Sequence, residues 1–129
     1  MTNNQKARQK IIFIEDDEML VRAYRNKLTM EGFEVDISSN GLDAIQKLTS
    51  DGYDLVLLDL MLPKINGLDV LKQIRSSGWP LSKIPVIVFS NLSDASDIKE
   101  AKDLGANEYL IKANLSPEEV LEKIREHLK

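Results

Sequence analysis

Oxygen-bearing and cationic side chains follow the apolar segments of this 129-residue sequence. Glu15 and Asp16 come directly after the run IIFI, and Asp59 comes after LVLL. Ser90 follows VIVF, and Lys112 follows YLI. Three carboxylates, a hydroxyl and an ammonium form a set that suits a hard divalent cation and a phosphoryl group.

The carboxylates of this set should be relieved by protonation or by a cation, because burying unpaired carboxylates together is costly, and a hard cation is the favoured interpretation. All the candidate metal ligands are oxygens, which favours Mg²⁺, with Mn²⁺ as a substitute. Beside such an ion, Asp59 can act as a nucleophile and accept a phosphoryl group as an acyl phosphate. Lys112 and Ser90 are then the donors available to the phosphoryl oxygens.

Length and composition exclude several other classes of protein. A chain of this length forms one domain of ordinary size, and the absence of Cys excludes disulfides, thiolate metal sites and cysteine nucleophiles. The net charge of -4 argues against direct nucleic-acid binding. The start, MTNNQKARQ, is polar and no apolar run approaches the ~20 residues of a membrane span, so we expect a cytoplasmic protein that does not contact membranes.

Strand-like and helix-like segments alternate along the chain, which predicts βα units around a parallel sheet. The predicted strands are residues 10–15, 33–38, 53–58, 84–89 and 107–111. The third and fourth are apolar enough to be central, whereas FEVDIS alternates and is typical of an edge. We therefore predict an α/β fold with a doubly wound, flavodoxin-like parallel sheet of five strands in the order 2-1-3-4-5, and five helices on its two faces.

Capping residues mark several of the predicted helix boundaries. Asn40 and Asn66 each precede GLD as N-caps, and SPEE, beginning at Ser116, predicts a capping box. We expect three glycines to end helices in the left-handed conformation: Gly32, Gly52 and Gly105. Trp79 is expected to lie in a loop that covers an edge of the core.

This topology predicts where the site lies. In an open α/β sheet, ligands bind beyond the carboxyl ends of the strands, at the switch point between strands 1 and 3. Glu15, Asp16 and Asp59 follow those two strands, while Ser90 and Lys112 follow strands 4 and 5. All five side chains should therefore meet at one edge of the sheet.

At these residues the chain resembles the receiver domain of two-component response regulators, of the single-domain kind found in chemotaxis. Pro63 and Gly67 follow Asp59 at the receiver spacing in LLDLMLPKINGLDVL, and the site residues come in receiver order. The resemblance covers almost the whole chain. We assign residues 1–9 to a polar N-terminal tail and residues 10–129 to the receiver domain.

The resemblance implies a phosphoacceptor and a metal shell. Asp59 would be the phosphoacceptor. Asp16, Asp59 and the main-chain carbonyl of Met61 would bind Mg²⁺ directly, and Glu15 would act through water.

The resemblance also implies a phosphoryl-binding pair and a switch. Ser90 and Lys112 would bind the phosphoryl group. Tyr109, three residues before Lys112, would turn inward when Ser90 moves toward the phosphate.

Two of the departures from the receiver pattern directly follow Lys112 and Ser90. Receivers usually have Pro after the lysine, often with a cis peptide between them. Ala113 follows Lys112 here, and a cis bond without Pro costs about 2.5 to 4 kcal/mol, so the conformation of this peptide is open. Asn91 stands after Ser90 where a small residue is common, and either narrows access to Asp59 or adds a hydrogen bond.

The resemblance implies that a histidine kinase or a histidine phosphotransfer protein donates the phosphoryl group. The protein would then catalyse only its own phosphorylation and dephosphorylation. The alternative is a receiver-like interaction module that works without phosphorylation. A phosphohydrolase of the haloacid-dehalogenase type would need a second acid two residues after Asp59, where Met61 stands, and an FMN carrier would need a hydroxyl-rich loop in place of EDDE.

The sequence ends at Lys129, together with the predicted fifth helix. We expect either a single-domain regulator without an output domain or a piece of a longer protein. A stand-alone regulator would act on a downstream protein, which the sequence does not identify. The surface of the fourth helix, fifth strand and fifth helix is the expected contact, and also the expected interface of a phosphorylation-dependent dimer.

Overall fold

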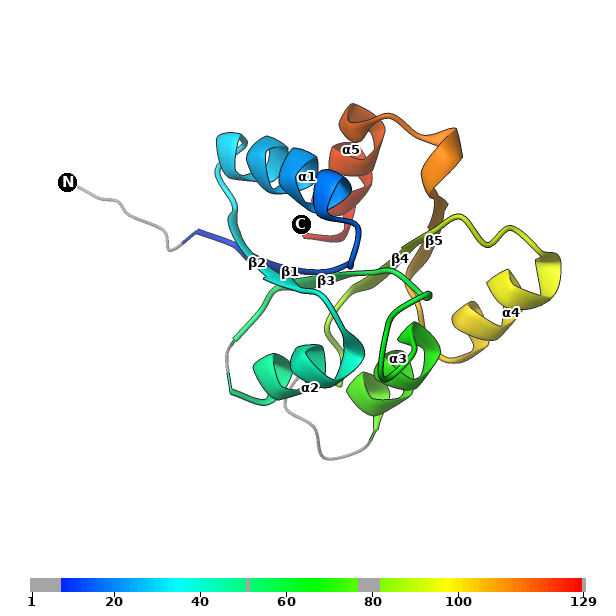
Figure 1. Ribbon diagram of the computed structural model, residues 1–129. Coiled ribbons are helices and arrows are strands. Elements are labelled where there is room, and N and C mark those ends of the chain that lie inside the picture. Colours follow the sequence, from blue (N-terminus) through cyan, green and yellow to red (C-terminus); the bar gives the residue numbers. More distant parts are fainter. Residues whose placement is uncertain (1–7, 51, 77–81, 129) are drawn as a thin grey trace.

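The structure is a computed structural model that describes residues 8–50, 52–76 and 82–128 (Figure 1). The strands are β1 (Lys10–Ile14), β2 (Glu34–Ser38), β3 (Leu55–Leu58), β4 (Val86–Ser90) and β5 (Glu108–Ile111). The helices are α1 (Glu18–Met30), α2 (Gly41–Ser50), α3 (Gly67–Arg75), α4 (Ala95–Asp103) and α5 (Pro117–His127). A short 3-10 turn, η1 (Lys112–Asn114), joins β5 to α5.

The five strands form one parallel sheet in the order β2-β1-β3-β4-β5, which confirms the predicted fold class. Every residue of β3 and β4 is buried, and β2 lies at an edge, as their apolar and alternating patterns predict. Two strands begin two residues later than predicted. In β4 the reason is Pro85, which has no N–H to donate to the ladder, so that pairing begins at Val86.

Helices cover both faces of the sheet, with α1 and α5 on one side and α2, α3 and α4 on the other (Figure 1). Successive strand residues point to opposite faces, so each strand contributes to two cores. Toward α1 and α5, the rings of Phe13 and Phe89 pack against Tyr24 with centroids 5.9 and 5.2 Å away. Toward α2 and α3, the core is mostly aliphatic, including Ile14 and Leu58, with the ring of Tyr53 among them.

The predicted caps are present at most helix boundaries. The Asn40 and Asn66 side chains accept backbone N–H groups, and Ser116 forms the full capping box. Gly32 and Gly105 have φ of 96° and 106°, as predicted. The prediction for Gly52 is wrong, because its φ lies outside the left-handed region; the Thr49 and Ser50 hydroxyls instead donate to carbonyls in the last turn of α2.

Two predictions fall on parts of the chain that the structure does not describe. Trp79 lies outside the described residues, and so does most of the predicted tail, residues 1–9. Within the described part of the chain, no helix has both the length and the apolar character needed to cross a bilayer.

Candidate functional site

The register of the sheet brings the predicted site residues to its carboxyl edge. Ile14 pairs with Leu58, so Glu15 and Asp59 leave neighbouring strands side by side, and the Asp59 N–H donates to the Ile14 carbonyl at 3.0 Å. Ser90 is the last residue of β4 and pairs with Ile111, directly before Lys112. The parallel pairing of four strands therefore builds the site.

Three carboxylates form an acidic cluster at this edge. Glu15, Asp16 and Asp59 each offer one oxygen, and these oxygens lie within 4.8 Å of one another. Glu15 and Asp59 are 1% and 4% exposed, whereas Asp16 is exposed to solvent. The acidic cluster is thus open on the Asp16 side and closed toward the sheet.

Lys112 supplies the positive charge inside the site. Its ammonium nitrogen lies 2.7 Å from Glu15 Oε1 and 3.3 Å from Asp59 Oδ2. The other oxygen of Asp59, Oδ1, accepts the N–H of Met61 at 3.2 Å. These contacts fix both oxygens of Asp59, one toward the ammonium and the other toward the β3–α3 loop.

The acidic cluster fits a hard divalent cation. One ammonium faces three carboxylates, so negative charge remains uncompensated. Among the described residues, the Lys112 ammonium is the only donor near the buried Glu15 Oε1, which has no aligned hydrogen bond. An all-oxygen set with an open, exposed member leaves room for the waters that Mg²⁺ retains.

Burial has opposite consequences for the two partners of the buried ion pair. Burial raises the pKa of Glu15 from 4.5 to about 7; the Lys112 ammonium opposes this shift and the charge of Asp59 adds to it. Burial alone would lower the pKa of Lys112, but the carboxylates of Glu15 and Asp59 outweigh it and raise this pKa above its ordinary value. Lys112 therefore stays cationic, while Glu15 changes charge near neutral pH.

The raised pKa of Glu15 predicts a pH dependence of stability in metal-free protein. The folded state binds this proton more tightly than the unfolded state, so the stabilisation is complete below pH 4.5 and is lost as the pH rises through about 7. The free energy of unfolding, measured with urea and a chelator, should fall across this window by up to about 3 kcal/mol relative to Glu15→Gln. Parallel profiles for the two proteins would contradict the assignment to Glu15.

Ser90 and Tyr109 are joined through the loop that follows β4. Ser90 is fully buried, and its hydroxyl oxygen accepts the N–H of Leu92 at 3.2 Å. The hydroxyl of the half-buried Tyr109 donates to the Leu92 carbonyl at 2.8 Å, and burial raises the pKa of Tyr109. A displacement of Ser90 would therefore act, through Leu92, on the hydrogen bond of the Tyr109 hydroxyl.

Two of the departures from the receiver pattern, Asn91 and Ala113, contact each other. No cis peptide occurs among the described residues, so the Lys112–Ala113 bond is trans. The N–H of Ala113 donates to the Asn91 side-chain oxygen at 3.0 Å. Of the two effects considered for Asn91, the structure shows the added hydrogen bond.

The loop that carries Met61 is held by two glycines: Gly67, which belongs to the receiver spacing after Asp59, and Gly41, which the sequence reasoning did not connect with the site. A methyl group on Gly67 would overlap the main-chain oxygen of Asp59, and one on Gly41 would overlap the Ile65 carbonyl. The Gly67 N–H donates to the Leu60 carbonyl at 2.9 Å, and the Gly41 N–H to the Pro63 carbonyl at 3.3 Å. Close backbone approach thus places the loop against α2 and α3.

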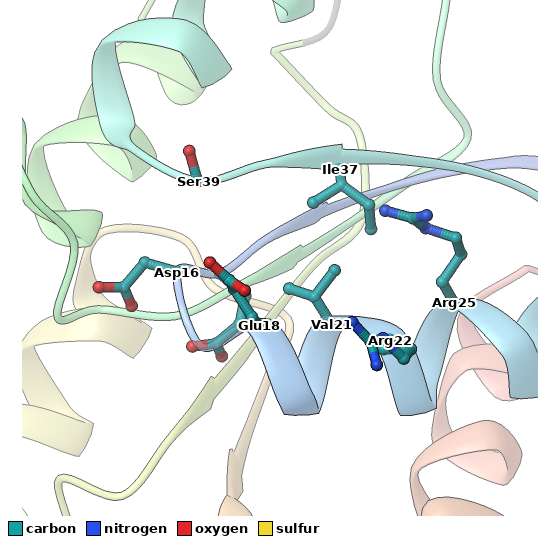
Figure 2. A pocket seen from close by; sticks show the side chains of 8 residues that line it. Asp16, Glu18, Val21, Arg22, Arg25, Ile37 and Ser39 are labelled. Atoms are coloured by element: carbon teal, nitrogen blue, oxygen red, sulfur yellow. The ribbon is translucent and has the colours of Figure 1, made fainter.

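A hollow of about 260 Å³ lies beside the acidic cluster, between α1 and β2, and the sequence reasoning did not find it. Figure 2 shows acidic side chains at one end, Arg25 toward the other, and the apolar Val21 and Ile37 between them. The complete lining is Glu15, Asp16, Glu18, Val21, Arg22, Arg25, Ile37 and Ser39. It is formed by separate elements, which explains why no local pattern reveals it.

Comparison with known proteins identifies the family. The family model described as "Response regulator receiver domain" matches residues 11–125. The chain belongs to this family. Receiver domains among the solved structures include a CheY-like protein from Methanospirillum hungatei, with a TM-score of 0.87, 24% identity, and coverage of 95% of this chain and 94% of that one. This confirms the five-stranded, doubly wound receiver fold.

More similar receiver sequences occur in a longer regulator and in a solved structure of similar length. Response regulator ArlR of Staphylococcus saprophyticus is 39% identical over 120 residues, which are 93% of this chain and 52% of that protein. The receiver domain described here thus spans about half the length of this curated relative. The phosphorylated cyanobacterial phytochrome response regulator RcpA has 34% identity, a TM-score of 0.84, and coverage of 95% of this chain and 94% of that one.

Proposed function

We propose that the protein is a phosphoacceptor switch in which Asp59 receives a phosphoryl group from a phosphohistidine. The donor is a histidine kinase or a histidine phosphotransfer protein, and the reaction depends on Mg²⁺, with Mn²⁺ as a substitute. The observation that carries this proposal is the buried Asp59 carboxylate, which lies within the acidic cluster and 3.3 Å from the Lys112 ammonium. A nucleophile, candidate metal ligands and a cation occupy one edge of the sheet.

The acidic cluster supports the metal-binding residues that the receiver resemblance implies. Asp16, Asp59 and, on the resemblance alone, the main-chain carbonyl of Met61 would hold Mg²⁺ directly, and Glu15 would act through water. When bound, the ion supplies positive charge for the phosphoryl oxygens and for the crowded carboxylates. The raised pKa of Glu15 fits this role, because a group that carries a proton near pH 7 without metal can release it when a cation arrives.

The reaction itself requires little covalent chemistry from the protein. An Asp59 carboxylate oxygen forms a bond to phosphorus as the phosphorus–nitrogen bond of phosphohistidine breaks, and the bonding electrons return to the imidazole. Lys112, now 2.7 Å from Glu15, turns its ammonium to one phosphoryl oxygen, and the Ser90 hydroxyl donates to another. In-line positioning and charge neutralisation provide the acceleration. The protein catalyses only its own phosphorylation and dephosphorylation.

Ser90 transmits the chemical change to the surface. Its movement toward the phosphoryl group breaks the contact with Leu92, whose carbonyl holds the Tyr109 hydroxyl at 2.8 Å. Tyr109 then turns inward and alters the surface of α4, β5 and α5. This surface contacts a downstream protein, and it is also the interface of a phosphorylation-dependent dimer.

The cellular setting follows from the same proposal. The domain works in the cytoplasm and, with a net charge of -4, has no direct contact with nucleic acid or membranes. The chain spans about half the length of the curated relatives it matches, and the activity of those whole proteins is not assigned to it.

Beryllofluoride distinguishes the phosphoacceptor switch from a receiver-like module that works without phosphorylation. With Mg²⁺, this phosphoryl mimic should bind Asp59 and shift the backbone amide resonances of Ser90, Leu92 and Tyr109, because these residues share the hydrogen bonds described above. Residues at the opposite end of the sheet, such as Gly32, should shift little. An unchanged spectrum at saturating Mg²⁺ and beryllofluoride would favour the interaction module.

A further inference from the structure

The β4–α4 loop and the η1 turn are joined by one side chain. Asn91, the first residue after β4, accepts the N–H of Ala113 through its side-chain oxygen at 3.0 Å, across 22 positions of the sequence. Both residues are exposed, so neither is held there by burial in the core. The hydrogen bond joins the segment that ends in Ser90 to the turn that begins with Lys112.

The Asn91 side-chain oxygen accepts one of the N–H groups at the beginning of η1. The first N–H groups of a helical turn have no carbonyl of their own turn to bind, and a side chain usually fills this role from the N-cap position. The N-cap of η1 is Ile111, which makes no side-chain hydrogen bond. Asn91 therefore caps η1 from a distant part of the chain.

The capped turn carries Lys112 into the site. A lysine side chain has many rotamers, so the direction of its main chain strongly affects where its ammonium can reach. The Lys112 ammonium must meet Glu15 at 2.7 Å and Asp59 at 3.3 Å from the beginning of η1. A turn whose first N–H groups lack an acceptor would hold this main chain less firmly.

We propose that Asn91 is a positioning residue for Lys112: by capping η1 through the Ala113 N–H, it keeps the ammonium at the phosphoryl position next to Asp59. This inference rests on the proposed function, in which Lys112 binds the phosphoryl group. The contact adds to the β4–β5 pairing, which places Ser90 beside Ile111, because Asn91 directly follows Ser90.

Binding of beryllofluoride tests this role, since Lys112 contacts the phosphoryl group and is not a metal ligand. Asn91→Ala should weaken beryllofluoride binding about three- to tenfold at saturating Mg²⁺, without lowering the affinity for Mg²⁺ itself. General loss of structure would reduce both affinities. Asn114→Ala is the matched control, because Asn114 lies exposed in the same turn and its side chain makes no hydrogen bond with any described residue. It should bind beryllofluoride like the wild type.

A double-mutant cycle tests the hydrogen bond itself. Ala113→Pro removes the N–H donor, so Asn91→Ala should have no further effect on beryllofluoride affinity in that background. Hydrogen exchange of the Ala113 amide should also become faster in Asn91→Ala. Equal beryllofluoride affinity in the wild type and Asn91→Ala would overturn this inference alone, as would an undiminished effect in the Pro background. If the wild type takes up no beryllofluoride, the proposed function fails and this inference falls with it.

Discussion

Asp59→Asn should abolish phosphoryl acceptance. Incubated with acetyl phosphate and Mg²⁺, the wild type should gain one phosphoryl group at Asp59, whereas the rate for Asp59→Asn should fall by at least roughly 10²-fold. The amide is close in shape to the carboxylate, but it is a poor nucleophile and removes one charge from the acidic cluster. Intact-mass spectrometry against time measures both rates, and peptide mapping locates the modification.

Asp69→Asn provides the matched control for this experiment. Asp69 is an exposed acid in the first turn of α3, and its change to Asn also removes one charge. It should be labelled at the wild-type rate. Labelling of Asp59→Asn at a rate comparable to that of the wild type would show that another residue is the acceptor, and the assignment of Asp59 would have to be abandoned.

Gly67→Ala should cause a large loss of stability. The added methyl group would overlap the main-chain oxygen of Asp59 and lie 2.5 Å from the Leu60 Cα, and neither backbone atom can move away like the end of a flexible side chain. We expect the free energy of unfolding, measured with urea, to fall by about 3 kcal/mol, the upper part of the range for overpacked sites. The strain falls on the phosphoacceptor, so phosphorylation of the folded fraction should also slow.

Gly52→Ala controls for the general effect of a Gly to Ala change. Among the described residues, no atom lies within 4 Å of the added methyl group, and the φ of Gly52 is outside the left-handed region. Its free energy of unfolding should stay within about 0.5 kcal/mol of the wild type, or rise slightly as the unfolded chain loses freedom. If Gly67→Ala were as stable as Gly52→Ala, the close approach of α3 to the end of β3 would not be a constraint.

The sequence by itself determined the fold and the composition of the site. Fully apolar segments such as LVLL and VIVF are typical of central strands, and the alternating FEVDIS is typical of an edge strand, as the structure confirms. The strand order is predicted from the flavodoxin-like fold that five alternating βα units suit. The capping box at Ser116 is equally local, because its partners lie within one turn. Residues directly after these strands then converge by topology alone, as the acidic cluster confirms.

Only the tertiary structure decided how the site residues interact. The Lys112 ammonium lies closer to Glu15 than to Asp59. The pKa of Glu15 is raised by burial, and the depth of this burial depends on how the strands pack. The Asn91–Ala113 hydrogen bond joins residues 22 positions apart, and its geometry follows from two loops that no short pattern describes. The sequence assigns Gly52 to a helix end and Gly67 to the receiver spacing, but only the packed chain shows that a methyl group on Gly67 would meet another backbone segment. Propensity and periodicity act over a few residues, whereas contact distances and electrostatic environment arise when the whole chain is packed.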